Sequence, residues 1–352
     1  MKLRMSVLAL FCALAALPAC VAPRASAQGT GPAGAGSTVA ALGAAVTPTD
    51  PLFAADAWRF TRTQLPAAWA AGTGGLVTIA VVDTGVSPVG DLAGATVLPG
   101  YNAMTGTADV ADDNGHGTAV ASVIAGEADN GLGSAGVCWG CRILPVKVLG
   151  ADGSGSTATV AAGVDWAVDH GAQVVNLSLG GTESDPMLAD AVAYAESKNV
   201  VVVAAAGNND TTAPEYPADY PGVVSVAASD QGDNRASYSD FGSWVQLAAP
   251  GCAVAQNVDT TFAIWCGTSI AAPIVSGIAG LALSDAPSAG ASQVESALYA
   301  KADAVPGGYV AHGRVDALGA LQALGVAPAA TQAAKVAKAK HTVVHGRVAR
   351  AG

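Results

Sequence analysis

Residues 77–85 read Val-Thr-Ile-Ala-Val-Val-Asp-Thr-Gly, an apolar run that ends on an acid, a hydroxyl residue and a glycine. A short, continuous apolar run is typical of a central strand of a parallel sheet, where both faces are buried. Similar runs recur along the chain at Ile143–Leu149, Val174–Leu179, Val200–Ala205 and Val223–Ala227. We therefore expect a mostly parallel sheet that contains the strand of residues 77–85.

Helix-like segments separate these runs. They lie near residues 116–126, 157–169, 185–197, 268–284 and 291–300. Strands and helices that alternate in this way predict an α/β fold with three layers, in which helices cover both faces of the sheet. We therefore expect a three-layer α/β/α domain.

The length and composition fit one large folded domain. The chain has 352 residues, of which 51% are hydrophobic and 12% are charged, so a disordered chain is excluded. No repeat or boundary divides the alternating region, which we take as one domain from residue 48 to residue 324. Residues 28–47 are rich in Gly, Ala, Ser and Thr and are expected to form a flexible leader, and residues 325–352 a disordered, basic, Ala/Lys-rich tail.

The first 27 residues have the pattern of an export signal. Lys2 and Arg4 precede an apolar stretch that is too short to span a bilayer, and Ala25-Ser26-Ala27 supplies the small residues that precede a cleavage point. Secretion is the expected outcome, with lipid anchoring through Cys20 as the alternative. The sequence predicts no transmembrane segment.

The charges are unevenly distributed. The chain has 16 bases and 27 acids, but eight bases lie in the signal and in the acid-free C-terminal segment, which leaves eight bases against 27 acids between them. A body this acidic argues against nucleic acid as a partner and is compatible with bound cations, although solubility alone explains most of such a charge.

Four cysteines remain after cleavage of the signal. In an oxidising compartment an even number favours disulfides, and we expect the local pairs Cys138–Cys141 and Cys252–Cys266. A zinc site would need a second close pair of ligands. A redox CxxC motif normally opens a helix, whereas a strand-like run follows this one.

Three short motifs carry candidate catalytic residues. Asp83 follows an apolar run and is expected at the carboxyl end of a parallel strand, where α/β sheets place their chemistry, although such an aspartate often only caps a turn. His116, in Asn-Gly-His-Gly-Thr, is expected at a helix start, where a hydrogen-bonded core histidine is the alternative. Ser269, in Gly-Thr-Ser-Ile-Ala-Ala-Pro, opens another helix, where it is either an N-cap or a nucleophile beside backbone N–H groups.

The three residues together predict acyl transfer. A serine hydroxyl becomes a good nucleophile when a histidine takes its proton and a carboxylate holds that histidine in one tautomer. The order Asp, His, Ser along the chain is that of subtilisin and differs from the orders in chymotrypsin-like enzymes and α/β-hydrolases. On these motifs the chain resembles the subtilase family, most of all its thermitase-type branch, from about Thr47 to Leu324.

The resemblance implies a subtilisin-like fold and the activity of a serine endopeptidase with no catalytic cofactor. Ala-Ala-Gly-Asn at residues 205–208 matches the oxyanion-hole segment of the family, so Asn208 is expected to donate its side-chain amide to the developing oxyanion. Leu-Ser-Leu-Gly-Gly at residues 177–181 matches the substrate-binding edge, where the backbone of Ser178, Leu179 and Gly180 would pair with an extended peptide. We expect a monomer that acts on proteins or peptides.

Glu215 occupies a position that the resemblance assigns to the base of the primary specificity pocket. A carboxylate there would favour Lys or Arg before the scissile bond through a charge-assisted hydrogen bond. The alternative is that Glu215 faces solvent.

The resemblance also implies a structural Ca²⁺ ion. Its ligands would come from three segments that offer carboxylate, amide and carbonyl oxygens, which suit this ion. The expected ligands are Asp50, Asp91, Ala128, Asn130, Leu132 and Ser134. An ordinary turn-rich loop is the alternative for residues 128–134.

Two rival functions remain at this point. A peptide-binding protein without activity would be expected to lack a triad residue or the oxyanion donor, and all four residues are present. An esterase or transpeptidase would form the same acyl-enzyme, so the sequence does not separate it from a protease.

Overall fold

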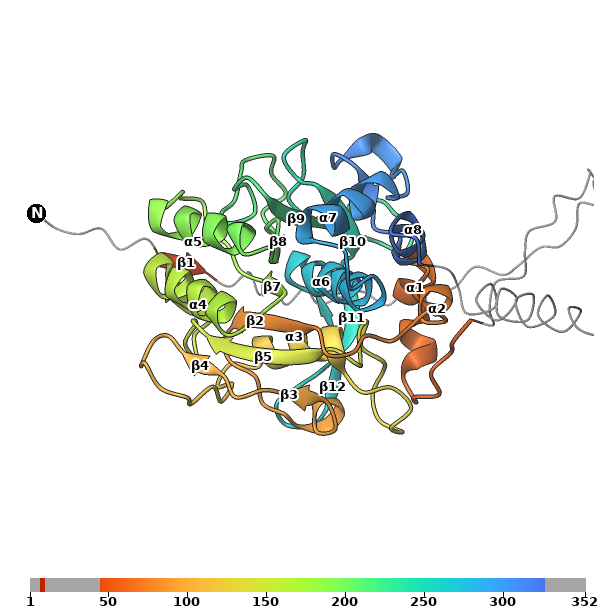
Figure 1. The fold of residues 1–352 in the computed structure, drawn as a ribbon, viewed down its shortest axis with the longest axis horizontal. Coiled ribbons are helices and arrows are strands. Elements are labelled where there is room, and N and C mark those ends of the chain that lie inside the picture. The colour runs from red at the N-terminus through yellow and green to blue at the C-terminus, as the bar shows by residue number, and fades with distance from the viewer. Residues whose placement is uncertain (1–6, 10–44, 327–352) are drawn as a thin grey trace, which may run out of the picture.

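A parallel sheet forms the middle of the computed structural model, which describes residues 7–9 and 45–326 (Figure 1). Every pairing in this nine-stranded sheet is parallel. Its order is β13 (Gly313–Arg314), β10 (Leu247–Pro250), β9 (Val223–Ser229), β8 (Val201–Ala205), β7 (Val174–Leu177), β2 (Thr78–Asp83), β5 (Arg142–Lys147) and β3 (Thr96–Val97), with β4 (Tyr101–Asn102) also on β5. The strand that contains Asp83 lies inside the sheet, as the sequence predicts.

Alternate side chains of each strand enter two different cores, because successive residues point to opposite faces. Ile79 and Val81 of β2 belong to one core, and Ala80 and Val82 belong to the other. The first core is covered by α1 (Phe53–Arg62), α2 (Leu65–Ala68), α3 (His116–Ala125), α6 (Thr268–Asp285), α7 (Ala291–Ala300) and α8 (Ala317–Ala323). The second is covered by α4 (Thr157–Asp169) and α5 (Pro186–Ser197). The predicted three-layer α/β/α fold is confirmed.

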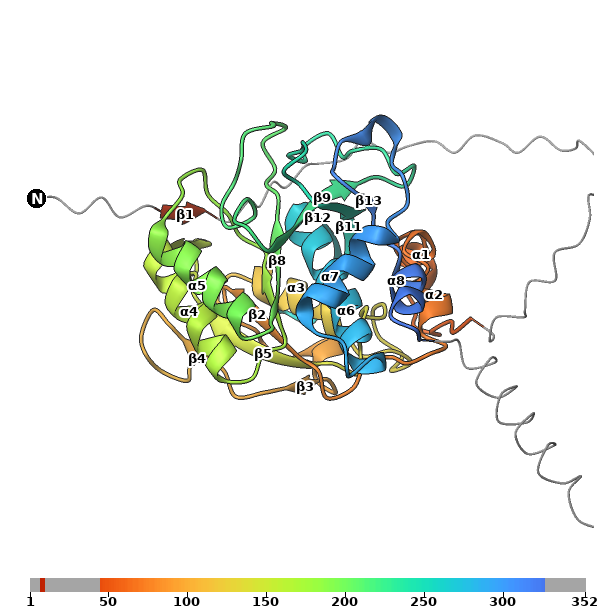
Figure 2. The same ribbon diagram turned by 45° about the horizontal axis from the view of Figure 1, so that its top comes forward.

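The two helical layers are easy to follow in the figures. In both views α4 and α5 lie together at one side of the molecule, and α1, α2 and α8 lie together at the other (Figures 1 and 2). Gly163 allows α4 to approach the sheet closely, since a Cβ atom there would lie 2.5 Å from a methyl group of Val148. A larger residue at that position would separate the layers.

Two small antiparallel pairs lie outside the main sheet. β11 (Cys252–Gln256) and β12 (Phe262–Cys266) form a hairpin immediately before α6. β1 (Val7–Ala9) pairs with β6 (Ser154–Ser156), so the edge of β6 accepts an extended strand from elsewhere in the chain. The remaining residues of the predicted signal, most of the leader and most of the basic tail lie outside the described residues.

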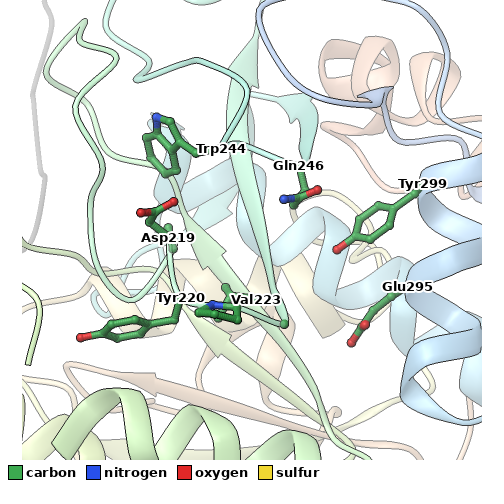
Figure 3. A pocket seen from close by; sticks show the side chains of 10 residues that line it. Asp219, Tyr220, Val223, Trp244, Gln246, Glu295 and Tyr299 are labelled. Atoms are coloured by element: carbon green, nitrogen blue, oxygen red, sulfur yellow. The ribbon is translucent and has the colours of Figure 1, made fainter. Parts of the chain in front are cut away.

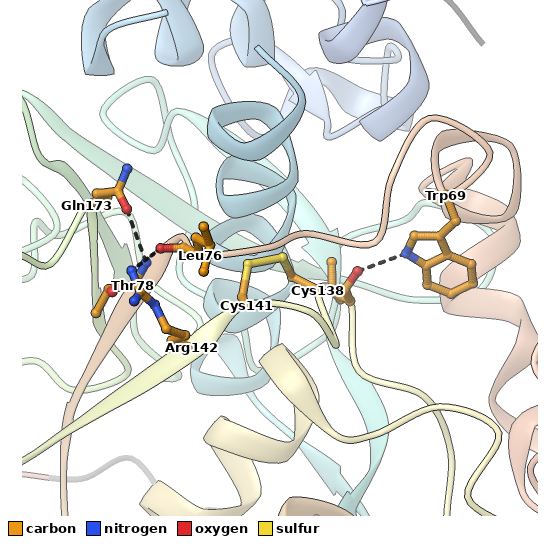
Figure 4. The surroundings of a disulfide bond; sticks show 8 residues. Trp69, Leu76, Thr78, Cys138, Cys141, Arg142 and Gln173 are labelled. Atoms are coloured by element: carbon orange, nitrogen blue, oxygen red, sulfur yellow. Dashed lines mark hydrogen bonds between the residues drawn. A yellow bond between two sulfur atoms is a disulfide. The ribbon is translucent and has the colours of Figure 1, made fainter. Parts of the chain in front are cut away.

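Both local disulfides are present in the structure. Cys138–Cys141 packs against α6 at Gly280, where a Cβ atom would lie 2.9 Å from the sulfur of Cys141, and Trp69 donates to the neighbouring Val137 carbonyl over 2.9 Å (Figure 4). Cys252–Cys266 joins β11 to β12 at directly paired positions. This second bridge ends three residues before Ser269, so it restrains the chain where it enters α6.

Candidate active site

Asp83 and His116 meet between the end of β2 and the start of α3. Both side chains are buried, and Nδ1 of His116 lies 2.8 and 3.0 Å from the two carboxylate oxygens of Asp83. An ionised carboxylate only accepts hydrogen bonds, so this contact places the imidazole proton on Nδ1 and leaves a lone pair on Nε2. Nε2 is buried and has no hydrogen-bond partner among the described residues. The arrangement can therefore take up a proton at Nε2.

Asp112 holds both segments of this pair in place. One oxygen accepts from the hydroxyl of Thr84 and from the backbone N–H of Gly115, and the other accepts from the N–H and the hydroxyl of Thr118. The hydroxyl of Thr84 in turn accepts from the N–H of Gly117. The sequence analysis did not single out Asp112, although its position in the loop before a helix is a common one for an acid that accepts backbone N–H bonds.

Ser269 lies in the first turn of α6, and a buried chain of hydrogen bonds fixes its backbone to β7. The hydroxyl of Ser178 donates to the carbonyl of Ser269 over 2.8 Å and accepts from the amide of Asn176. The amide oxygen of Asn176 accepts from the hydroxyl of Ser276, which lies about two turns after Ser269 in α6. Strand β7 ends at Leu177, two residues earlier than the sequence predicts.

Asn208 follows β8 and lies near Ser269. Its side-chain oxygen accepts from both the backbone N–H and the hydroxyl of Thr268, over 2.9 and 3.1 Å. A backbone N–H can only donate, which fixes the orientation of the amide and turns Nδ2 away from Thr268. A Cβ atom on Gly267 would lie 2.9 Å from Oγ of Ser269 and 3.6 Å from Nδ2 of Asn208, so both atoms face the same small space.

Trp265 completes the surroundings of the imidazole and was missed by the sequence analysis. Its indole lies edge-on to the ring of His116 with centroids 6.2 Å apart, and its N–H donates to Asn257 over 3.0 Å. A half-buried tryptophan at the end of β12 shields one side of the histidine from water. Its position four residues before Ser269 was the only signal in the sequence.

The predicted substrate-binding segment adjoins the segment of Glu215. Gly181 and Tyr216 exchange two backbone hydrogen bonds, which place Glu215 beside the end of residues 178–180. On its other side, Oε1 of Glu215 accepts from the amide of Asn209 over 3.0 Å, next to Asn208. Glu215 therefore lies between the predicted peptide edge and the predicted oxyanion donor.

Glu215 is buried, with 1% of its surface exposed, so the alternative that it faces solvent is wrong. Burial, and to a smaller extent the charge of Asp240, raise the pKa of Glu215 to about 7, against the hydrogen bond from Asn209. A carboxyl with this pKa is ready to ionise when a cation arrives.

The predicted calcium segments come together around residues 128–134. The carboxylate of Asp50 accepts from the backbone N–H groups of Asp129, Asn130 and Gly131. Asp91 is also buried and accepts from the amide of Asn130 over 3.1 Å. Burial raises the pKa of Asp91 to about 6, and the charges of Asp50 and Glu127 act in the same direction.

The donor set suits a hard cation better than a transition metal. Asp50 and Asp91 bring two buried carboxyls to the loop of residues 128–134, which also offers an amide and backbone carbonyl oxygens. Within residues 7–9 and 45–326, no group of three or more His, Cys, Asp or Glu side chains is gathered in metal-binding positions. The residues fit Ca²⁺, for which backbone carbonyls supply part of the shell.

A separate pocket of about 330 Å³ lies between the segment of residues 218–223 and α7 (Figure 3). Trp244, Gln246, Glu295 and Tyr299 line it, and none of the predicted catalytic residues does.

In the part of the chain that the structure describes, α6 is long and apolar enough to cross a membrane, and most of it is buried inside the molecule.

The family model described as the subtilase family matches residues 74–338. The chain belongs to the subtilase family. It is similar to thermitase from Thermoactinomyces vulgaris, with 44% identity over 280 residues that cover 78% of this chain and 99% of thermitase. It is also similar to Subtilisin BL from Lederbergia lenta, with 42% identity over 66% of this chain and 85% of that protein.

Among solved structures, a protease from Pseudoalteromonas arctica superposes with a TM-score of 0.72 and 32% identity, covering 79% of this chain and all of that chain. Family and relatives agree with the resemblance that the motifs indicate. This subtilase is a subtilisin-like serine endopeptidase.

Proposed function

We propose that Ser269 is the nucleophile, His116 the general base and Asp83 the residue that orients the base. The main support for this proposal is the buried contact of 2.8 Å between Asp83 and Nδ1 of His116, which leaves the lone pair of Nε2 available. Oγ of Ser269 attacks the carbonyl carbon of the scissile bond while Nε2 takes its proton. The imidazolium then gives that proton to the leaving amine, and water hydrolyses the acyl-enzyme by the same route.

Asn208 donates Nδ2 to the oxyanion of the tetrahedral intermediate in this proposal. Thr268 supports the role, because it occupies the amide oxygen and so directs Nδ2 to the side of Ser269. A donor that is already oriented needs no rearrangement when charge develops on the oxygen.

The peptide substrate lies along residues Ser178–Gly180 and is held by backbone hydrogen bonds as an added strand. The edge of β6 is the second strand that we assign to this function, which the sequence analysis did not include. Its pairing with Val7–Ala9 in an antiparallel register supports the assignment, because a peptide substrate would pair with the same backbone groups of Ser154–Ser156.

Fluorophosphonate labelling combined with casein digestion tests the proposed activity. The parent protein is expected to be labelled and to digest casein, and Ser269→Ala is expected to lose both, whereas Ser284→Ala, near the far end of the same helix, keeps the label. Labelling of the Ser269→Ala variant would contradict the assignment of the nucleophile. Labelling of the parent without casein cleavage would favour an esterase or a transpeptidase.

Glu215 gives the enzyme a preference for Lys or Arg immediately before the scissile bond. The support is its position between residues 178–181 and Asn208, together with an oxygen, Oε2, that is buried and has no hydrogen-bond partner among the described residues. A peptide-library profile is expected to show enrichment of basic residues that Glu215→Gln removes. A profile without that enrichment would contradict the preference.

Ca²⁺ is proposed as a structural ion held by Asp50, Asp91, Asn130 and backbone carbonyls of residues 128–134. When bound, the ion would supply positive charge to the buried carboxyls of Asp50 and Asp91, and the chain itself orders the loop through three N–H bonds to Asp50. In the Ser269→Ala background, a chelator is expected to lower the melting temperature, and added Ca²⁺ to restore it while Mg²⁺ does not. A melting temperature that is unchanged by the chelator would contradict the site.

We further propose that the enzyme is exported through the signal at residues 1–27 and acts outside the cell as a monomer. Lipid anchoring through Cys20 is the competing route. Mass spectrometry of the mature N-terminus separates them, since cleavage after Ala27 leaves a free N-terminus and anchoring leaves an acylated Cys20.

A further inference from the structure

Glu215 has a second buried carboxyl beside it, Asp240, which lies in the loop after β9. Glu215 is 1% exposed and Asp240 is fully buried. Each has one carboxylate oxygen, Oε2 and Oδ2 respectively, that is buried and has no hydrogen-bond partner among the described residues. Unpartnered buried carboxylate oxygens are costly, so a pair of them requires an explanation.

The two carboxyls lie on one side of Gly207. A Cβ atom on that residue would lie 2.2 Å from Oδ2 of Asp240 and 3.0 Å from Cγ of Glu215, so these two atoms are at most about 5 Å apart. Gly207 also has a φ of +113°, which disfavours any side chain there. The glycine therefore makes room for both acids immediately before Asn208.

The other carboxylate oxygen of each acid, Oδ1 of Asp240 and Oε1 of Glu215, accepts hydrogen bonds from the chain. Oδ1 of Asp240 accepts from the backbone N–H groups of Asn209 and Thr211, each over 2.9 Å, and Oε1 of Glu215 accepts from the side chain of Asn209. These bonds anchor both acids to the segment that follows Asn208. Oδ2 of Asp240 and Oε2 of Glu215 take no part in these bonds, so they are not needed to hold the loop in place.

The charged groups around the pair leave it without a counter-ion. Burial raises the pKa of Asp240 and the charge of Asp210 adds to that rise, while Arg235, a cation of the same loop, pairs with Asp210 over 2.7 Å. Asp219 is connected to Glu215 only through its backbone N–H. No ion pair is found for Glu215 or Asp240 among residues 45–326.

We propose that Asp240 is a second specificity-determining residue, and that it and Glu215 together bind the cationic side chain of a Lys or Arg that precedes the scissile bond. This inference rests on the proposed protease activity and deepens it. The location carries it, because the pair lies between residues 178–181, which would hold the peptide backbone, and Asn208, which would hold the scissile carbonyl oxygen.

Below about pH 7 the pair retains a proton when no cation is bound, and a bound cation stabilises the doubly charged form. Both unpartnered oxygens are closed to solvent in this structure. The side chain of the substrate must therefore displace the protein atoms that cover them. A Lys or Arg side chain can do so, because its apolar stem tolerates burial while its charged end supplies the missing partner.

The preference for a basic residue is therefore expected to depend on pH. Burial raises the pKa of both carboxyls, that of Glu215 to about 7, so below this pH the pair holds a proton that must be released before Lys or Arg binds. Above it the pair is already charged. The preference should rise with pH across the neutral range.

The experiment measures kcat/KM for two peptides that differ only in Lys or Met before the scissile bond, at pH 6 and pH 8.5. The ratio of the two values is used, because any effect of pH on the catalytic steps that the two peptides share affects both values equally and cancels. The parent ratio is expected to rise about tenfold between the two pH values, since a cation is held more tightly by charged partners than by neutral ones.

Two conservative variants separate the roles of the acids. Asp240→Asn retains an oxygen for Asn209 and Thr211, and Glu215→Gln retains one for Asn209, so each variant alters mainly the unpartnered atom. Asp240→Asn is expected to lower the ratio at pH 8.5 by about tenfold, which is the loss of one charge-assisted contact. It should also abolish most of the rise with pH, because Glu215 alone ionises at lower pH. Asp219→Asn is the matched control and should preserve the ratio at both pH values.

An Asp240→Asn variant that keeps the parent ratio at both pH values would overturn the proposal, as would a parent ratio that does not change with pH. Failure of the protease proposal gives a different result, because the parent would then not be labelled by a fluorophosphonate and would cleave neither peptide.

Discussion

Asp83 and Glu215 are both buried carboxyls of the candidate active site, and their partners differ. Asp83 is fully buried, yet His116 and the backbone N–H of Thr84 satisfy it within the chain. Glu215 is equally buried, but its nearest charged neighbour is another acid, Asp240. A buried carboxylate needs either a positive partner or a proton. The chain supplies the partner in the first region and leaves that of the second to be supplied from outside.

The largest expected effect comes from disrupting the contact between Asp83 and His116. Asp83→Asn retains the shape of the side chain, but its amide can donate to Nδ1 and so favours the imidazole tautomer with the proton on Nε2. In another serine protease the same change lowers kcat by about 10⁴-fold, and we expect a loss of that size here with KM little changed. Steady-state kinetics on a peptide substrate measures it.

Asp190→Asn, an exposed aspartate of α5, is the control for this substitution and should retain the parent kcat. If Asp83→Asn lost less than tenfold in kcat while folding normally, Asp83 would not be the residue that orients the base.

Asn208, next in the chain to the residue that donates to Glu215, gives the next largest effect. Asn208→Leu removes the proposed oxyanion donor, and the loss of one such donor in a subtilisin costs about 10²–10³ in kcat. Thr268→Val leaves Asn208 in place but removes one of the two donors to its oxygen and the acceptor for Gly207, so a loss in kcat of about tenfold is expected. Equal losses in the two variants would contradict the ranking, because the positioning residue would then matter as much as the donor.

The sequence was sufficient to predict the strands and helices that carry Asp83, His116 and Ser269. Asp83, His116 and Ser269 each follow or open a strongly patterned strand or helix, and the five predicted strands and five predicted helices all occur in the structure. Hydrophobic periodicity determines such elements locally, so their ends could be placed within a few residues. The short helix α2, the strand β13 and the half-exposed hairpin β11–β12 have no such pattern and were not predicted.

The acid pair could be predicted only in part. Glu215 was identified through the resemblance, but Asp240 lies 25 residues further along the chain in a loop with no motif. Its role depends on the fold, which brings its loop against Gly207, where Asp240 donates its own backbone N–H to the Gly207 carbonyl. Contacts of this kind between loops leave no periodic signal in a single sequence. Trp265 beside His116 is a second example.

Burial of Glu215 without a positive partner should affect the free energy of unfolding as well as the cleavage specificity. A carboxyl whose pKa is raised on folding contributes fully below its unfolded pKa, and that stability is lost as the pH rises through the folded pKa. For Glu215 the window runs from about 4.5 to about 7. Glu215→Gln should therefore be as stable as the parent at pH 4.5 and more stable at pH 8, by roughly 2 kcal/mol.

Denaturant unfolding of both proteins in the Ser269→Ala background, which prevents self-digestion, measures this difference at the two pH values. Asp83→Asn serves as the contrast, since loss of a satisfied carboxylate should not stabilise the protein at pH 8. A Glu215→Gln variant with the same advantage at both pH values would indicate that burial of the charge is not the cause.

The smallest expected effect comes from outside the pair. Asp210 is largely exposed, and its charge raises the pKa of Asp240 while it pairs with Arg235. Asp210→Asn removes that charge and frees Arg235, and both changes lower the pKa of Asp240. Because water and salt screen an exposed charge, the pH at which the Lys preference is half-developed should fall by less than about 0.5 units. The same peptide pair, measured at closely spaced pH values, detects the shift, and high salt should reduce it. A shift to higher pH would contradict the sign of the interaction, because it would mean that Asp210 favours the charged form of the pair.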